Sequence, residues 1–414
     1  MTIAEATVRL SIPAQGLSLE ELEIRIGQLV KQAAHDLLRQ ACQHMDAELV
    51  HNEPAVRAVK KRSLHLLTRF GWTRLVRWQV RDAQGRYHCP LDQLLGLAAG
   101  QHISPWIRDR AIGLATRLPF RQAACLLGTF VDEAIDHRSL HRWIQKAGAQ
   151  IVRAEDALQQ AVFANGALPP QDDRQRELIL TEVDGTFLRA QREEGPKFEV
   201  RLGILTTGKS LVSPSAKNRR YRLQERICYA GVETAQDFGE RLFLKGEAHL
   251  GLSRARHLLL VGDGADWIEA LAGHDRWRAT YQIDWWHLTQ AFQRTFPEHP
   301  KIVHKLKQAL YRGQAHQIIP TVRLAQLNHI GDPDRVASLL GYLHTNQAGF
   351  YGPRSLRPHL SAQARLVCVD GSGAVEKHID LTICRRFKGQ GMRWTRAGAN
   401  RLLKLRVQEL ARAA

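Results

Sequence analysis

The sequence predicts an α/β core, a mixed sheet flanked by helices, with an α-helical insertion inside it and a mainly helical region before it. An antiparallel hairpin is indicated by two apolar runs, LILTEVDGTFL and FEVRLGILTTG, joined by a polar Gly-Pro turn. Parallel strands are indicated by HLLLVGDGADWIEAL and ATYQIDWWHLTQAF, which each reach an aspartate and pass into a helix. Helical spacing dominates the segment at 104–148 and most of 286–365.

The composition favours a polyanionic partner. The 414 residues include 59 Lys and Arg against 41 Asp and Glu, which gives a formal net charge of +18. Nucleic acid fits such a charge best. An anionic membrane is the weaker alternative, because no apolar stretch of about 18 residues is present to span one. We see no secretory leader, and the six dispersed cysteines form no CxxC pair, which predicts a reduced, cytoplasmic setting.

Residues 1–70 are predicted to form an N-terminal helical region. Apolar residues recur at helical spacing after Ser18, and Glu20 and Glu21 occupy a plausible first turn. This helix either mediates dimerisation or packs on the core, and core packing is the favoured interpretation.

Residues 71–165 are predicted to hold a hairpin and a helix-turn-helix-like DNA-binding region. The hairpin covers 72–89, around the turn-like DAQG. A first helix from about Phe120, a break near Gly128 and a second helix after Asp136 have the order of a helix-turn-helix. Its second helix would offer four polar side chains to DNA, namely Arg138, Ser139, His141 and Arg142. Such helix pairs also occur in domains that bind no DNA.

A polar run at 165–175, rich in Gly, Pro and Asp, is the best linker candidate. The first part of the core is assigned to 176–285, the helical insertion to 286–365 and the second part of the core to 366–414. Strand character returns at RLVCVDG, before basic C-terminal helices.

Two acids lie where the predicted strands can bring them together. Asp184 is in the middle of one apolar strand, and Asp263 follows the LLLVG run. Neighbouring strands are about 4.8 Å apart, so their carboxylates can share one cation. Oxygen ligands suit Mg²⁺, and a pair of such ions requires a third acid. Alternatively, Asp184 is a strand residue whose carboxylate only accepts hydrogen bonds from backbone amides. The alternative for Asp263 is an ordinary turn aspartate before Gly264.

Glu376, in the first turn after a Gly-Ser-Gly break, is the predicted third acid, and two Mg²⁺ or Mn²⁺ ions are the predicted cofactors. A favourable interaction with the helix dipole is the alternative for Glu376, and Asp370 and Asp380 are its nearest competitors. Asp284 and His287 are predicted to support the site or to position DNA, with core packing as the alternative.

Two neighbouring segments carry aromatic side chains beside the predicted acids. Trp285 and Trp286 cannot both face the same way, so at least one is predicted to be in the core, and the other could stack on an unpaired base. The segment after Glu376 is strongly basic and is predicted to bind DNA phosphates, although a solvated face is the alternative. Its candidate DNA-binding residues are Arg385, Arg386, Lys388, Arg393, Trp394 and Arg396.

Four motifs, EVDGTFL, VGDGADWI, IDWWHLTQAF and GSGAVEKHIDLTICRRFKGQGMRWTRAGANRLLKLR, occur in this order. With them the chain resembles the ISLre2/ISKra4-related (UPF0236-like) family of bacterial insertion-sequence DDE transposases, over roughly residues 70–410. The resemblance implies an RNase H-like catalytic core with a helical insertion between the second aspartate and the glutamate. It also implies that Asp184, Asp263 and Glu376 are the catalytic, metal-binding residues of a Mg²⁺-dependent transposase.

The resemblance further implies metal-dependent DNA cleavage and strand transfer in the bacterial cytoplasm, in association with the nucleoid. The expected partner is double-stranded DNA, both transposon ends and target, with no membrane and no small-molecule cofactor. Because two ends must be held together, a homodimer or higher oligomer is expected. Two alternatives are a domesticated, non-cleaving DNA-binding regulator and a metal-dependent nuclease without joining activity. A phosphatase acting on small substrates fits the charge of +18 poorly.

Overall fold

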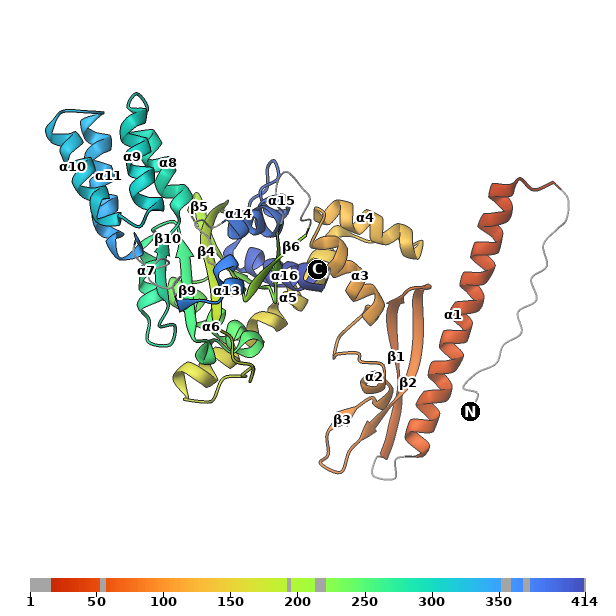
Figure 1. The fold of residues 1–414 in the computed structure, drawn as a ribbon. Coiled ribbons are helices and arrows are strands. Elements are labelled where there is room, and N and C mark those ends of the chain that lie inside the picture. Colours follow the sequence, from red (N-terminus) through yellow and green to blue (C-terminus); the bar gives the residue numbers. More distant parts are fainter. Residues whose placement is uncertain are drawn as a thin grey trace. The chain divides into compact units, whose positions relative to one another are not determined.

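The structure is a computed structural model, and it describes residues 16–52, 57–191, 195–212, 221–350, 359–367 and 373–412 (Figure 1). The chain divides into two compact units, Met1–Ile144 and Gln145–Ala414. The long helix α5 (His137–Gln159) begins in the first unit and ends in the second.

The first unit contains a three-stranded antiparallel sheet, in the order β1-β2-β3, against which α1 packs. Cys42 of α1 lies in a core cluster with Leu64, Leu66 and Leu75 of the sheet. The elements of this unit before α5 are α1 (Leu19–His51), β1 (Arg57–Thr68), β2 (Gly71–Arg81), β3 (Tyr87–His88), α2 (Pro90–Leu94), α3 (Pro105–Ala115) and α4 (Phe120–Val131).

The N-terminal helix is confirmed, but the helical description of residues 1–70 is wrong for Arg57–Thr68. A capping box starts α1, because the Ser18 side chain accepts the N–H of Glu21 and the Glu21 carboxylate accepts the N–H of Ser18. Arg57–Thr68 is the strand β1 and pairs with β2 along its length. The hairpin at 72–89 is confirmed in β2 and β3, although β1 is the longer partner of β2.

The helix pair expected at 120–148 is present as α4 and α5, with the break displaced. Helix α4 continues through Gly128 and ends at Val131, and Asp132 adopts a left-handed conformation with φ 54°. A Cβ on Gly128 would lie 2.7 Å from the carbonyl oxygen of Glu133. Gly128 is therefore needed for the close approach of the next turn and does not itself break the helix.

The second unit is built on a mixed five-stranded sheet in the order β10-β9-β4-β5-β8. Strands β10, β9 and β4 run parallel, whereas β4, β5 and β8 are antiparallel neighbours. The bounds are β4 (Leu178–Arg189), β5 (Lys197–Thr206), β8 (Ile227–Gly231), β9 (His257–Gly262) and β10 (Thr280–Ile283), with β6 (Gly208–Leu211) and β7 (Tyr221–Gln224) forming a separate ribbon. The predicted hairpin and both strand-helix units are thereby confirmed.

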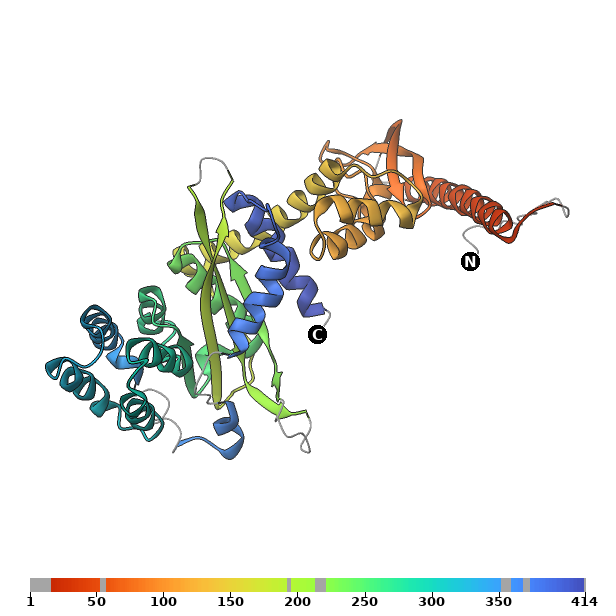
Figure 2. The same cartoon turned by 90° about the horizontal axis from the view of Figure 1, so that it is seen from above.

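Helices cover both faces of this sheet (Figure 2). One face, with Ile179 and Val183 of β4, packs against α6 and α7. The opposite face, with Leu178 and Leu180, packs against α13, and α14 contacts β4 and β5. The elements are η1 (Gln160–Ala164), α6 (Ala235–Leu250), η2 (Leu252–Arg254), α7 (Asp266–Gly273), α13 (Ala362–Val367), α14 (Gly373–Ile379), η6 (Asp380–Cys384), α15 (Arg385–Phe387) and α16 (Arg396–Arg412).

The predicted helical insertion follows β10 and has its own core, which includes Phe292, Leu306, Val322 and Leu343. Its elements are α8 (Trp285–Thr295), α9 (Pro300–Tyr311), η3 (Ala315–Gln317), α10 (Ile318–Leu327), α11 (Pro333–Thr345) and η4 (Gln347–Phe350). No described helix of either unit has the length and apolar character needed to cross a membrane.

The strand expected at RLVCVDG is wrong for its first three residues. Arg365–Val367 end the helix α13, while residues 368–371 lie outside the described ranges. Ser361 accepts the N–H of Ala364 at 3.2 Å, and Ala364 packs with Leu360 on the sheet. A capped first turn and this apolar contact favour the helix over the strand.

Candidate functional site

Parallel pairing of β4 and β9 brings the first two predicted acids to neighbouring positions. Glu182 of β4 lies opposite Val261 of β9. Continued by two residues, that register places Asp184 opposite Asp263, which directly follows β9. Both aspartates are partly buried.

The surroundings of Asp184 raise the pKa of its carboxyl group. Burial raises this pKa to about 6, with further contributions from the negative charges of Asp263 and Glu376. The N–H of Gly185, 2.6 Å from the carboxylate, and nearby His287 act in the opposite direction. The three acids predicted from the sequence therefore lie within electrostatic range of one another, and a bound cation would offset their repulsion.

Glu376 is positioned by an acid that the sequence analysis missed. Glu182 is 2% exposed, and its Oε2 accepts the backbone N–H groups of Ala374 and Val375, both at 3.0 Å. These amides belong to the first turn of α14, which carries Glu376. Burial raises the pKa of Glu182 to about 7. The available signal was a second acid two residues before Asp184, on the same face of an otherwise apolar strand.

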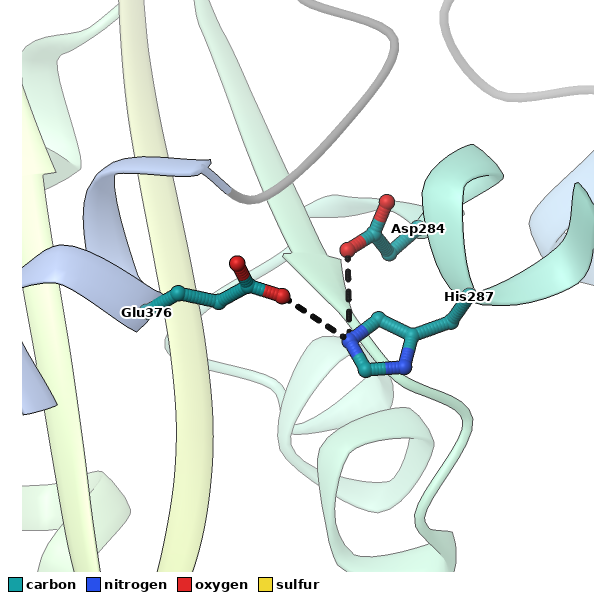
Figure 3. A group of neighbouring side chains, drawn as sticks. All are labelled: Asp284, His287 and Glu376. Carbon is teal, nitrogen blue, oxygen red and sulfur yellow. Dashed lines mark ion pairs between the residues drawn. The ribbon is translucent and has the colours of Figure 1, made fainter. Parts of the chain in front are cut away.

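Asp284 and His287 lie at this site, as predicted. Asp284 follows β10, is 1% exposed and donates its N–H to the carbonyl of Gly262 at 2.7 Å. Its Oδ1 accepts the N–H of Trp286 at 2.7 Å and so caps α8. One turn later, Nε2 of His287 lies 3.6 Å from Oδ2 of Asp284 and 3.5 Å from Oε1 of Glu376 (Figure 3).

The insertion contacts the loop that carries Asp263. The hydroxyl of Tyr342 in α11 donates to the carbonyl oxygen of Asp263 at 2.8 Å. Gly264 has φ +96°, and a Cβ there would lie 2.9 Å from atoms of both Tyr342 and Asn346, so this close approach requires glycine. Asp263 also accepts the N–H of Ala265 at 3.1 Å, as its alternative interpretation as a turn aspartate expects.

A groove of about 870 Å³ opens beside Asp263 and His287. Residues of α8 and α11 line it, including Arg294 and Arg335. Both arginines are exposed. The groove therefore offers space and two arginine side chains beside Asp263, with Asp334 as a further acid in its lining.

The donor set fits a hard divalent cation. Carboxylates of Asp184, Asp263 and Glu376 supply the oxygen ligands that Mg²⁺ and Mn²⁺ take in proteins. In the described part of the chain, a tighter group of possible ligand atoms, all within 4.8 Å of one another, comes from Asp284, His287 and Glu376. The competitor Asp380 is exposed and pairs with Arg385 at 2.8 Å, and Asp370 lies outside the described residues.

The basic segment after Glu376 divides into exposed and buried side chains. Arg385, Lys388, Arg393 and Arg396 are exposed. Nζ of Lys388 donates to the hydroxyl of Thr186 at 2.6 Å, which places this cation beside the strand of Asp184. A role in phosphate binding stays a prediction for these residues.

Arg386 does not fit the prediction of a phosphate contact. It is 2% exposed, its guanidinium lies 5.3 Å from the Trp394 ring centroid, and burial lowers its pKa to about 10. Trp394 is partly buried, donates its indole N–H to the carbonyl of Phe387 and pairs through its backbone with Arg189 and Gln191. Arg386 and Trp394 therefore pack against each other inside the fold, where the chain after α15 returns to the end of β4.

Other predicted contact residues are exposed. Arg138, His141 and Arg142 are exposed in the first turns of α5, where their contact with DNA stays a prediction.

Of the two tryptophans at the start of α8, Trp285 is 1% exposed and Trp286 is 51% exposed. One is therefore a core residue, as expected, and the other is accessible.

Two comparisons relate the chain to known proteins. The family described as an uncharacterised protein family, UPF0236, matches residues 12–412. A protein described as "UPF0236 protein in vanSb 3′region", from Streptococcus gallolyticus, is 23% identical over 399 residues, which cover 94% of this chain and 82% of that protein. Neither description states an activity.

Proposed function

The chain belongs to the UPF0236 family, and we propose that this member is a DNA transposase that binds the ends of a mobile element. It would cleave and transfer DNA strands by a metal-dependent DDE mechanism. The observation that carries the proposal is the gathering of Asp184, Asp263 and Glu376 from two adjacent parallel strands and a helix.

The sheet supports an RNase H-like core. Three antiparallel strands, β4, β5 and β8, are followed in the chain by β9 and β10, which extend the sheet parallel to β4 on its other side. Such a core places acids of the first and fourth strands next to each other. The insertion after β10 and the return of the chain to α14 agree with the expected position of the third acid.

Charge supports DNA as the substrate. A net charge of +18 contrasts with the acidic site, so phosphates would be attracted to the surface and metal ions to the centre. Arg294 and Arg335 in the groove, with Lys388 beside β4, are positioned to contact a DNA backbone near the acids.

Each group then has a role. Asp184, Asp263 and Glu376 would hold two Mg²⁺ or Mn²⁺ ions, which when bound supply activation of the attacking oxygen and stabilisation of the leaving oxygen. The basic residues would orient the scissile phosphate. In the cleavage step, water would form a bond to the scissile phosphorus and lose a proton, while the 3′ oxygen leaves with the electron pair and is protonated, which gives a 3′ hydroxyl and a 5′ phosphate. In the transfer step, the 3′ hydroxyl would lose its proton and its oxygen would form a bond to a target phosphorus, while the target's 3′ oxygen leaves with the electron pair and is protonated. We place this activity in the bacterial cytoplasm, at the nucleoid, in a homodimer or higher oligomer.

A strand-cleavage assay with Asp263→Asn tests the proposal. We expect cleavage and joining of DNA that carries the sequences flanking the gene to be lost, while binding is kept or strengthened because a negative charge near phosphate is removed. Asp266→Asn, at an exposed acid in the next helix, is the matched control and should cleave normally. Cleavage without joining by the wild type would favour a nuclease, and binding without cleavage a regulator.

A further inference from the structure

The side chains of Asp284, His287 and Glu376 converge from two segments of the second unit that are far apart in the sequence (Figure 3). We propose that these three residues hold one divalent transition-metal ion of the Mn²⁺ type, with His287 as a direct nitrogen ligand. This assignment rests on the proposed function, because it concerns the same site. It adds two ligands, Asp284 and His287, and a class of metal.

The distances favour a shared ion over a direct hydrogen-bonded cluster. Nε2 of His287 is 3.6 Å from Asp284 and 3.5 Å from Glu376. Charge-assisted hydrogen bonds between such groups are about 2.7 to 2.9 Å long. Ligand atoms about 2.1 Å from one metal lie about 3.0 Å apart at octahedral angles and about 3.4 Å apart at tetrahedral angles. The two distances to Nε2, with all three ligand atoms within 4.8 Å of one another, leave room for an ion between them.

The ligand atoms are held in place by the fold. Asp284 is almost fully buried and uses Oδ1 to cap α8, which directs Oδ2 towards His287. The ring of His287 lies edge-on to that of Trp286, with centroids 4.9 Å apart. Glu376 is held by the first turn of α14, which Glu182 binds. Such anchoring lowers the entropic cost of assembling the ligands.

The negative charge of the carboxylates at this site would be offset by bound cations. Asp284 and Glu376 flank the imidazole of His287, and the register of β4 and β9 places the carboxylates of Asp184 and Asp263 at neighbouring positions. One ion held between Asp184 and Asp263 and another among Asp284, His287 and Glu376 would offset this charge.

The histidine adds a nitrogen ligand to a carboxylate site. Mg²⁺ takes oxygen ligands and keeps several waters, whereas imidazole is preferred by Zn²⁺, Fe²⁺ and Ni²⁺. Mn²⁺ shares the preference of Mg²⁺ for carboxylates and, as a transition metal, also accepts imidazole, so it is compatible with two oxygen ligands and one nitrogen ligand.

Pulsed electron paramagnetic resonance of Mn²⁺ added to the metal-free, full-length protein tests the inference. We expect the bound Mn²⁺ to show a ¹⁴N coupling from an imidazole. His287→Asn should abolish this coupling and weaken binding of one ion by at least about tenfold, the lower end of known effects in metal sites. The control, His304→Asn, at an exposed histidine of α9, should leave coupling and affinity unchanged. Circular dichroism verifies that both variants are folded.

Bound Mn²⁺ without ¹⁴N coupling in the wild type, or with the same coupling in His287→Asn, would overturn the inference. The first outcome would leave His287 as a side chain that contacts two carboxylates without binding the metal. Because this measurement needs no DNA, it separates the two proposals. DNA cleavage without nitrogen coupling retains the transposase and rejects the histidine ligand, whereas coupling without any cleavage retains the ligand and rejects the transposase.

Discussion

The carboxylate of Glu182 accepts the backbone N–H of Val375 at 3.0 Å. This bond, and its partner to Ala374, tie the strand of Asp184 to the helix of Glu376. The first and third acids of the site are therefore positioned relative to each other by Glu182, a buried residue two positions before Asp184 on the same strand.

Glu182→Ala should reduce DNA cleavage more than Glu182→Gln does. Alanine leaves two backbone amides without their acceptor and frees the first turn of α14, so we expect a loss in kcat of about 10- to 100-fold with KM for DNA little changed. Glutamine keeps an acceptor oxygen and should restore most of the rate. Single-turnover cleavage at varied DNA concentration measures the split. Equal rates in both variants and the wild type would contradict a positioning role.

Acid should weaken the second unit partly through Glu225. Its pKa is lowered to about 2, chiefly by Arg176, which donates to its carboxylate at 2.9 and 3.0 Å. A lowered folded-state pKa gives stability that is present above the unfolded value near 4.5 and is lost as the pH falls towards 2. Glu225→Gln should cost about 1 kcal/mol at pH 7 and flatten the acid limb of the stability curve.

Urea denaturation at a series of pH values measures this effect. Asp173→Asn is the matched control, because Asp173 pairs with Arg254 but its side chain is 85% exposed. It should change stability little at any pH. An acid limb as steep in Glu225→Gln as in the wild type would exclude this source of acid sensitivity.

Arg385 and Arg386 are adjacent in sequence but should differ in effect. Arg386→Ala removes a buried side chain that packs on Trp394, so we expect a loss of stability of about 2 kcal/mol or more. Arg385→Ala, at an exposed residue, should change stability by less than about 0.5 kcal/mol. Thermal unfolding of the two variants checks the contrast, and similar melting temperatures would contradict the burial of Arg386.

Lys388→Ala and Arg393→Ala should weaken DNA binding while the protein stays folded. Each removes one exposed cation, that of Lys388 beside the strand of Asp184, so the slope of log K against log salt should fall by about one for each DNA phosphate that the variant no longer neutralises. Arg254→Ala, at the opposite end of β9 from Asp263, serves as the control. Fluorescence anisotropy at several salt concentrations measures the slopes, and an equal change in all three variants would show that the charge acts only non-specifically.

Local patterns predicted much of the second unit. Two apolar runs joined by a polar Gly-Pro turn were sufficient to predict β4 and β5, and an apolar run that ends at an aspartate was sufficient to predict β9 and β10. Because neighbouring strands are about 4.8 Å apart, Asp184 and Asp263 could be proposed as a pair from the sequence, and the parallel register of β4 and β9 brings them opposite each other. The position of Glu376 depended on the family resemblance and on a Gly-Ser-Gly break.

Long-range contacts account for what the sequence did not reveal. The first seven residues of β1 are exposed and mostly polar, so only Leu64, Leu66 and Leu67 carried a strand signal. The capping of α14 by Glu182 and the burial of Arg386 against Trp394 form only when segments that are separate in the sequence pack together. Such contacts follow from tertiary packing and have no signature in local spacing.

Strand cleavage and joining by the wild type and by Glu376→Gln test the central claim most directly. The substrate is labelled DNA that carries the sequences flanking the gene, incubated with Mg²⁺ or EDTA, and Asp380→Asn is the control on the same continuous helical segment. The wild type and Asp380→Asn should cut at a defined end and yield joined products only with metal, and Glu376→Gln should yield neither. Equal cutting by Glu376→Gln, or tight binding without cutting by the wild type, would contradict a DDE transposase.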